Sequence, residues 1–432
     1  MDFIEKKYQE LLTKGRIDAE LYDTYQVKRG LRNANGTGVL VGLTKVAEVD
    51  GYKLVQQEKK EKDGILLYRG YDLKKIIEQD ETFSFEKTMY LLLFSDLPTE
   101  EDLKSFKAIL SDAYPLPMDF VENIILKNPS SSIMNHLMRC VLSLYSYDEN
   151  PDSVEPLELL KKGIAVIAKM PALVSYSLQA KTHYLDKDTL SIHYPKKEYS
   201  FAENLLYLSR NDGGFTALEA ELLDMCLTVH ADHGGGNNSA FVGTVVASTH
   251  TDLYSMLTAS LASLKGPKHG GANQKALDMM NTILEDVKED ASDAILIDRI
   301  ERILAKDYFD KSGLVYGIGH AIYTKSDPRC EILKKKASVL ARSKGNTKFA
   351  FFERFEVLAV QILSQKKGMQ VCANVDFYSG LIYEMLGIPR DLFLPIFACA
   401  RTAGWIAHNM EGILYCDKIC RPATKYVGDV KC

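Results

Sequence analysis

The sequence predicts an all-α, multi-helical protein of more than one domain, with a short β-hairpin near its N-terminus. Apolar residues recur at helical spacing along most of the chain, and strand-like runs occur only before residue 75. The chain has 432 residues, of which 46% are apolar, and a chain of this length normally forms more than one domain. No internal repeat or low-complexity linker divides it, so we expect the domains to meet at a hinge.

The predicted hairpin follows a turn-rich segment with several glycines between residues 30 and 42. Two runs, at 51–55 and 64–70, begin with glycine and continue with aromatic and aliphatic residues, which is typical of short strands. The charged segment 58–63 separates the two runs, and we expect it to connect them.

Helices are predicted by apolar stripes and by the residues at their ends. Thr99, followed by three acidic residues, is a capping residue at one helix start. Asp327 caps another helix, in which Pro328 takes the first position. Gly266 and Pro267 end a third. The stripes fall at 253–264, 276–287, 295–304 and 332–340.

The composition argues against membrane and nucleic-acid partners. No stretch approaches the about 18 uninterrupted apolar residues of a membrane span, and the first residues resemble neither a signal peptide nor a transit peptide. The net charge of −5 is unlike the basic surface that nucleic-acid binding requires. We therefore expect a cytoplasmic protein with no nucleic-acid partner and no membrane partner.

The eight cysteines are scattered, which favours free thiols in a reducing compartment over a disulfide framework. Cys416 and Cys420 are four residues apart and would share a face if they lay on one helix. No histidine or second cysteine pair completes a zinc set with them, so we predict no metal there.

Histidines concentrate in three glycine-containing islands that interrupt the helices, at 230–237, 266–273 and 317–329. Glycine lets backbone and ligand approach closely. A single histidine is more often structural, but three such islands in one chain favour a functional site. The islands hold four of the nine histidines, which are His230, His233, His269 and His320.

Two residues of these segments carry a specific chemical expectation. His269 precedes a helix predicted from about Asn273, whose positive end would lower the pKa of the imidazole. A neutral imidazole can donate a hydrogen bond to a developing oxyanion. Asp376, in a fourth polar segment at 374–380, lies just before a helix predicted from Tyr378. A capping role and a catalytic role are equally supported for it.

Three arginines complete the candidate site. Arg401 lies in the apolar helical run 393–407, where an unpaired charge is costly, so it needs a structural ion-pair partner or a substrate carboxylate. Arg329 lies in the first turn of its helix, and Arg421 follows the last long helix. The planar guanidinium can bind a carboxylate through two hydrogen bonds. Arginines and histidines together indicate a small dicarboxylate or an oxoacid as ligand.

The ordered set of islands resembles the citrate synthase family. Residues 230–237 are similar to its oxaloacetate-binding signature, and 374–380 to its catalytic aspartate motif. Residues 266–273 and 317–329 resemble its first and second catalytic histidine motifs. The spacing is similar too, with 36, 51 and 56 residues between successive members of the set His233, His269, His320 and Asp376. Segments 63–73 and 85–99 also resemble the family, so the likeness covers nearly the whole chain.

The resemblance implies a transferase that condenses acetyl-CoA with oxaloacetate and water to give citrate and CoA. Asp376 would remove a proton from the acetyl-CoA methyl group, while neutral His269 would stabilise the enolate. Enolate stabilisation has to accompany proton removal because a carboxylate alone is too weak a base. His320 would polarise the ketone of oxaloacetate and protonate the new alkoxide.

It also implies how oxaloacetate is held and how the chain assembles. His233, Arg329 and Arg401 would bind oxaloacetate, and Arg421 would reach the site of the neighbouring subunit in a homodimer. The implied fold is the all-α, two-domain citrate synthase fold. Residues 1–270 and 381–432 would form the large domain, with the dimer interface and the oxaloacetate side, and 271–380 the small domain on the CoA side. Hinged closure would exclude water from the enolate.

Coenzyme A is expected as a co-substrate, without any permanently bound cofactor or metal. Many family members carry an arginine in the turn after the second histidine that helps to bind CoA phosphate. This chain has only Lys325 as a nearby cation, with Lys366 and Lys367 as other candidates. The candidate CoA-binding residues are Val315, Gly317, Gly319, Lys325 and Asn374, with Gly313 in the same loop.

Three alternatives remain open. The closest is 2-methylcitrate synthesis from propionyl-CoA, since one methylene changes binding by only about 1–3 kcal/mol. A metal-dependent hydrolase could use His230, Asp232 and His233 as ligands, but the glycines and remote arginines have no role in it. A binding protein without catalysis would not need the intact set of two histidines and an aspartate.

Overall fold

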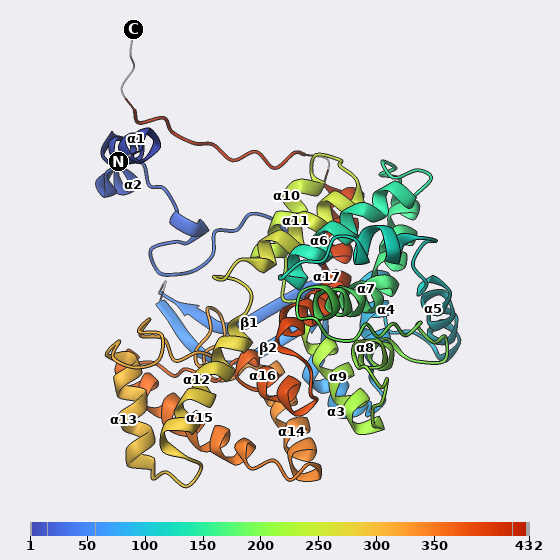
Figure 1. Cartoon of the computed structure of the whole chain (residues 1–432). Helices are drawn as coiled ribbons and strands as arrows, with labels where there is room; N and C mark the ends of the chain where they lie inside the picture. The colour runs from blue at the N-terminus through green and yellow to red at the C-terminus, as the bar shows by residue number, and fades with distance from the viewer. Residues whose placement is uncertain (1, 15, 57, 417, 429–432) are drawn as a thin grey trace. The chain divides into compact units, whose positions relative to one another are not determined.

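The computed structural model describes residues 2–14, 16–56, 58–416 and 418–428, which are predominantly helical (Figure 1). The strands are β1 (Ala47–Val55), β2 (Glu58–Tyr68) and β3 (Tyr71–Asp72), in that order in one sheet. The first eight helices are α1 (Phe3–Lys14), α2 (Ala19–Thr24), α3 (Leu73–Gln79), α4 (Phe85–Phe94), α5 (Glu100–Ala113), α6 (Ile133–Ser143), α7 (Pro156–Tyr184) and α8 (Phe201–Ser209). The later helices are α9 (Ala217–His230), α10 (Asn238–Ala247), α11 (Leu253–Lys265), α12 (Ala272–Val287), α13 (Asp293–Leu304), α14 (Pro328–Ser343), α15 (Lys348–Lys367), α16 (Val375–Met385) and α17 (Phe393–Tyr415). Short 3₁₀ or π turns lie at Arg29–Leu31, Val121–Leu126, Leu144–Tyr147 and Arg390–Leu392.

The chain divides into two compact units. One contains the described residues within Met1–Leu43, Leu54–Lys59 and Cys420–Cys432, and the other contains Thr44–Lys53 and Lys60–Ile419. The second unit holds the helices from α3 onward and all the predicted site residues except Arg421. The predicted large and small domains are a different division of the chain, and they stay a prediction.

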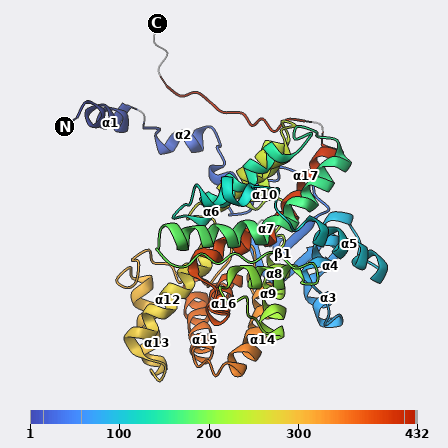
Figure 2. The same cartoon turned by 45° about the vertical axis from the view of Figure 1, so that its right-hand side comes forward.

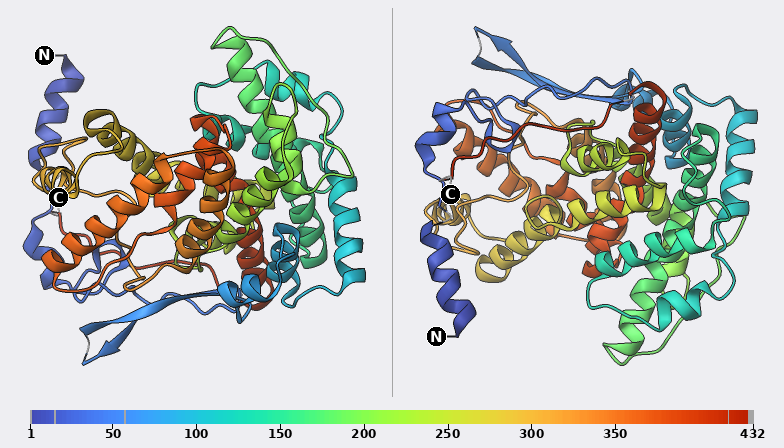
Figure 3. Two further views of the ribbon diagram at one scale, coloured as in Figure 1. Left: turned by 90° about the horizontal axis from the view of Figure 1, so that it is seen from below. Right: turned by 90° about the horizontal axis from the view of Figure 1, so that it is seen from above.

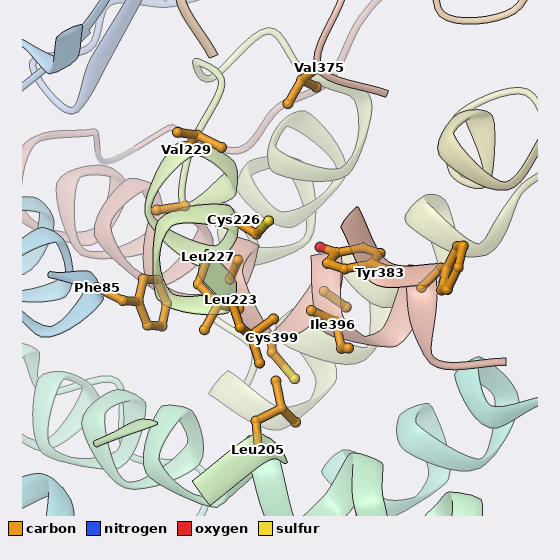
Figure 4. Packing of buried hydrophobic residues seen from close by; sticks show 14 of the residues in the cluster. Phe85, Leu205, Leu223, Cys226, Leu227, Val229, Val375, Tyr383, Ile396 and Cys399 are labelled. Atoms are coloured by element: carbon orange, nitrogen blue, oxygen red, sulfur yellow. The ribbon is translucent and has the colours of Figure 1, made fainter. Parts of the chain in front are cut away.

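Helix α17 is the central helix of the second unit. It contacts α4, α6, α7, α9, α10 and α11, and Figure 2 shows α7 and α17 side by side. Its sequence is apolar on nearly all sides, and such a helix is stable only when other helices cover it. Around it, Phe85 of α4, Leu205 of α8 and Cys226 of α9 pack near Cys399 of α17 (Figure 4).

A second group of helices surrounds α16. Helices α12 and α14 contact α16, and α15 contacts α13 and α14. These helices appear in yellow to orange in Figure 1. Gly380 allows the close approach of α16 to α12, because a Cβ there would lie 2.6 Å from the carbonyl oxygen of Asn273.

The β-hairpin differs from the sequence prediction. The strands are longer than predicted, and the charged segment 58–63 belongs to β2 rather than connecting two strands (Figure 3). Lys62 forms an ion pair with Asp50 of β1. Strand side chains point alternately to opposite faces, so charged residues are tolerated where at least one face meets water. The prediction failed because composition alone suggested a loop.

Most predicted helix ends are confirmed. Helix α5 begins after Thr99, which forms a capping box with Asp102, and α11 ends before Gly266. Helix α14 begins at Pro328, and the Asp327 side chain accepts a hydrogen bond from the backbone N–H of Arg329 at 3.0 Å.

The structure corrects the predictions for one helix and for one pair of cysteines. In α13, Leu296 is buried while the predicted stripe residue Ile295 is 41% exposed. Cys416 and Cys420 share no helix face, because α17 ends at Tyr415, and both side chains are exposed. Cys432 lies outside the described residues. Among the described helices, none combines the length and the apolar character needed to cross a membrane.

Candidate active site

Six predicted site residues from five separate parts of the sequence line one cavity in the second unit. They are His233, His269, His320, Arg329, Asp376 and Arg401. Arg421 belongs to the other unit, in the segment after α17, and its side chain is exposed. The cavity is also lined by the residues Asn237, Asn273, Leu394 and Phe397.

The first catalytic candidate, His269, follows α11 and precedes α12. Its Nε2 atom accepts a hydrogen bond from the backbone N–H of Ser239 at 3.3 Å. Since an N–H group can only donate, Nε2 carries no proton, and the neutral ring is protonated on Nδ1. Burial lowers the pKa of His269 to about 4, and the charge of Arg401 acts in the same direction. Burial and the charge of Arg401 therefore favour the neutral imidazole that the sequence predicts. The predicted contribution of the helix end stays a prediction.

The second candidate, His320, has the opposite tautomer. Its Nδ1 atom accepts hydrogen bonds from the backbone N–H groups of Ile322 and Tyr323, both at 3.1 Å. The neutral ring therefore carries its proton on Nε2. The ring stacks on Tyr323, with centroids 4.7 Å apart, and lies 5.2 Å from the His233 ring.

Asp376 lies inside the first turn of α16, which begins at Val375 and not near Tyr378 as predicted. The cap is Asn374, whose side-chain oxygen accepts a hydrogen bond from the Asp376 N–H at 3.0 Å. The capping role is therefore filled by Asn374, and the carboxyl group of Asp376 lines the cavity. Burial raises the pKa of Asp376 to about 6, against the opposing charges of Arg329 and Arg401. Such a carboxylate is a stronger base than usual and is still mostly ionised at neutral pH.

Arg329 is held rigidly by its neighbour in the sequence. Asp327 accepts two side-chain hydrogen bonds from Arg329, at 3.0 Å to Nε and 2.7 Å to Nη2. The same carboxylate accepts the backbone N–H of Val375 at 3.2 Å. Asp327 therefore joins the starts of α14 and α16 and places Arg329 beside Asp376.

Arg401 and His233 present buried nitrogens to the cavity. Arg401 donates from Nε to the carbonyl oxygen of His230 at 2.8 Å, and its guanidinium lies 4.6 Å from the centre of the Phe397 ring. Within the described residues, Arg401 Nη1 and His233 Nε2 are buried and have no hydrogen-bond partner. Buried polar groups are rarely left unpaired, so an acceptor-rich ligand is expected opposite them. Burial lowers the pKa of Arg401 to about 10, which leaves it charged at neutral pH.

The island around His233 is fixed by Asp232, Tyr68 and His408, whose supporting roles the sequence did not predict. The buried Asp232 carboxylate accepts the N–H of Gly234 at 2.7 Å and lies 3.3 Å from His408 Nε2 on α17. The Tyr68 hydroxyl of β2 accepts the N–H of Asp232 at 3.2 Å. In the described part of the chain, no three His, Cys, Asp or Glu side chains are arranged to hold a metal ion. Asp232 faces His408 and supports the loop, so the metal-hydrolase alternative loses its proposed ligand set.

The candidate CoA loop lies against the segment before α16. The backbone N–H of Asn374 donates to the carbonyl oxygen of Gly317 at 2.8 Å. The side-chain amide of Asn374 donates to the carbonyl oxygen of Gly319, also at 2.8 Å. Gly317 has a φ of +82°, and a Cβ there would lie 2.8 Å from Cβ of Phe377, so only glycine fits. Val315 is buried, and the Lys325 side chain is exposed. Lys366 forms an ion pair with Glu301. Lys367 lies near the loop, since its Nζ atom would be 3.7 Å from a Cβ placed on Gly319.

Sequence reasoning missed several residues of the site. Asn237 was inside a recognised island, and Phe397 lies one helical turn before Arg401, so both had a sequence signal. Tyr323, which stacks on His320, was also inside a recognised island, at 317–329. His408 had no such signal, because its contact with Asp232 depends on how segments far apart in the sequence fold together.

Known proteins resemble this chain over most of its length. Residues 33–423 match the family described as "Citrate synthase, C-terminal domain". The chain is 34% identical to the citrate synthase of Haloferax volcanii, over 94% of this chain and 96% of that one. It is 31% identical to a 2-methylcitrate synthase of Shewanella oneidensis, over 84% and 88% of the two chains. The structure is similar to the ternary complex of carboxymethyl coenzyme A and oxaloacetate with citrate synthase from Thermoplasma acidophilum. That comparison has a TM-score of 0.76 and 26% identity, and it covers 94% of this chain and 97% of that one. The chain therefore belongs to the citrate synthase family and is an enzyme of the citrate synthase type.

Proposed function

We propose that the cavity condenses acetyl-CoA with oxaloacetate and water to give citrate and CoA. The observation that carries this proposal is the convergence of Asp376, His269 and His320 on one cavity that also presents Arg329 and Arg401. A base, two oriented imidazoles and two guanidinium groups match the needs of a carbon–carbon condensation onto a dicarboxylic oxoacid.

Proton removal is the first step. Asp376 takes a proton from the methyl group of acetyl-CoA, and the raised pKa of its carboxyl group makes it a better base. The Nδ1–H group of neutral His269 donates to the thioester oxygen, where negative charge develops. The enolate is thereby stabilised while the proton leaves.

Condensation joins the methyl carbon to the ketone carbon of oxaloacetate. The Nε2–H group of His320 polarises the ketone and gives its proton to the alkoxide that forms. Arg329, Arg401 and His233 hold the carboxylates, which supply acceptors for Arg401 Nη1 and His233 Nε2. Water then hydrolyses the thioester of the product and releases CoA as the thiol.

CoA is a co-substrate in this scheme and would approach the loop that contains Gly313, Gly317 and Gly319. Val315, Lys325 and Asn374 are the further candidates for this contact, and Lys367 is supported by its position near Gly319. Residues 271–380 would form a small domain that closes over the substrates against 1–270 and 381–432. Closure keeps water from the enolate until the new bond has formed.

A homodimer with shared sites is part of the proposal, with Arg421 contributing to the site of the neighbouring subunit. The support comes from α10, which is apolar on all sides and contacts α11 and α17. Its residues Phe241, Val242 and Val245 are only partly buried. Helices of this composition are normally covered on every side, and a second copy would cover this face. The buried cysteines, which form no disulfide, support a reducing, cytoplasmic location.

Thiol release tests the function directly. The purified chain is mixed with oxaloacetate and either acetyl-CoA or propionyl-CoA, and the free thiol is measured with a chromogenic disulfide. We expect thiol release with both substrates to differ, with a higher kcat/KM for acetyl-CoA than for propionyl-CoA. Faster release with propionyl-CoA would reassign the chain to 2-methylcitrate synthesis, and no release with either would refute the proposal. Asp376→Asn should lose turnover severely while oxaloacetate still binds, as measured by calorimetry.

A further inference from the structure

A buried hydroxyl group binds the turn that follows His320 to both strands of the β-hairpin. Thr324, which is 5% exposed, donates its hydroxyl hydrogen to the carbonyl oxygen of Gly51 in β1 at 2.6 Å. The hydroxyl oxygen of Thr324 also accepts a hydrogen bond from the backbone N–H of Lys62 in β2 at 3.0 Å. One side chain therefore connects both strands to the segment that begins at His320.

The neighbouring residues of the turn add to this attachment. The backbone N–H of Lys325 donates to the carbonyl oxygen of Lys62 at 3.3 Å. The Ser326 hydroxyl accepts the backbone N–H of Gly64 at 3.1 Å. Hydrogen bonds from consecutive residues leave the turn little freedom to rotate against the hairpin.

Two glycines make room for this contact. A Cβ at Gly51 would lie 2.6 Å from the Cα of Tyr323, and one at Gly64 would lie 2.2 Å from the carbonyl oxygen of Ser326. Neither glycine has a positive φ, so space rather than backbone conformation requires glycine at these positions. The hairpin surface is therefore shaped to receive this turn.

The backbone of this turn also determines the orientation of His320. Its Nδ1 atom accepts the backbone N–H groups of Ile322 and Tyr323, the residues immediately before Thr324, and its ring stacks on Tyr323 at 4.7 Å. A displacement of the backbone at 322–324 would move both donors and the stacked ring together. The imidazole would then point its Nε2–H in a different direction.

We propose that Thr324 is a positioning residue, which orients His320 by attaching its turn to the hairpin. This inference rests on the role proposed above for His320. The hairpin then acts as a rigid support for the site, through contacts made by its backbone.

The test compares two substitutions at Thr324, one that removes the hydroxyl group and one that keeps it. Thr324→Val keeps the shape and removes the hydroxyl, and Thr324→Ser keeps the hydroxyl. We expect Thr324→Val to lower kcat by about 10- to 100-fold, because small misplacements of a catalytic group are costly. The KM for oxaloacetate should change by less than about threefold, since the arginines still hold its carboxylates. Thr324→Ser should restore kcat to within about threefold of wild type.

Controls separate positioning from general destabilisation. Thr258→Val removes a buried hydroxyl that has no partner among the described residues, and it should leave kcat unchanged. Circular dichroism and thermal melts establish that each variant is folded. If Thr324→Val does not fold, Ser326→Ala removes only the acceptor for Gly64, and a smaller loss of kcat with unchanged KM is expected.

The outcomes distinguish this inference from the proposed function. Wild-type kcat in a folded Thr324→Val variant would overturn the positioning role, as would an equal loss in Thr324→Ser. If the wild-type chain releases no thiol, the proposed function itself is wrong. If wild type is active and His320→Ala is inactive while Thr324→Val is normal, only the positioning role is wrong.

Discussion

Replacing Asp376 with asparagine should stabilise the folded protein while abolishing its activity. The pKa of the Asp376 carboxyl group is raised from 3.8 to about 6, mainly by burial, so the folded chain binds this proton more tightly than the unfolded chain. Ionisation therefore weakens folding as the pH rises from about 4 to about 6, and the full penalty persists at pH 7. Asparagine has a similar shape and cannot ionise, so it removes the penalty.

The size of the effect follows from the two pKa values. A change from 3.8 to about 6 corresponds to about 3 kcal/mol of unfolding free energy at pH 7. The side chain is only partly buried, and solvent screening lowers our expectation to about 2 kcal/mol. At pH 4.5 the Asp376 carboxyl group is already protonated in most of the folded wild-type protein. The stability advantage of Asp376→Asn should therefore fall to about 1 kcal/mol or less.

Urea unfolding of both proteins at pH 7 and pH 4.5 measures this difference, at one protein concentration because the proposed dimer would unfold in a concentration-dependent way. Asp290→Asn, a substitution of the same type at an exposed site, should change the unfolding free energy by less than about 0.5 kcal/mol. An Asp376→Asn protein that is no more stable than wild type at pH 7 would refute the reasoning. A gain that does not depend on pH would do the same.

Three further predictions concern the charges of the site. Asp327→Asn leaves Arg329 buried with a weaker partner, so the free energy of unfolding should fall by about 3–5 kcal/mol, and an unchanged urea midpoint would contradict the ion-pair argument. The kcat/KM for acetyl-CoA should decline as the pH falls below about 6, because Asp376 must be ionised to act as a base, and initial rates from pH 5 to 8 test this. Arg421→Ala and Arg401→Ala subunits should each be nearly inactive, but a mixture of the two should recover about a quarter of wild-type activity through hybrid dimers. No recovery, with hybrid formation verified by native mass spectrometry, would count against shared sites.

Much of the fold was predictable because local interactions decide helices. Apolar stripes and capping residues such as Thr99 and Asp327 act within a few residues of the chain, and the structure confirms both helix starts. The islands were predictable for a related reason, since glycine residues beside a histidine interrupt a helix whatever tertiary contacts the segment makes. The charged segment 58–63 was not predictable, because its strand pairing depends on partners elsewhere in the fold.

The sequence by itself determined that the chain is helical, where its helices begin, and which histidines, arginines and aspartate are candidates for catalysis. Only the tertiary structure decided the chemical state of those residues. The protonated nitrogen of His269 depends on the N–H of Ser239, and that of His320 on a turn seated against the hairpin. The raised pKa of Asp376 depends on burial, with Arg329 and Arg401 opposing it. Tautomers and pKa values respond to atoms a few ångströms away in space. For His269 and Asp376 those atoms belong to segments far apart in the sequence, and for His320 they belong to a local turn that contacts the distant hairpin.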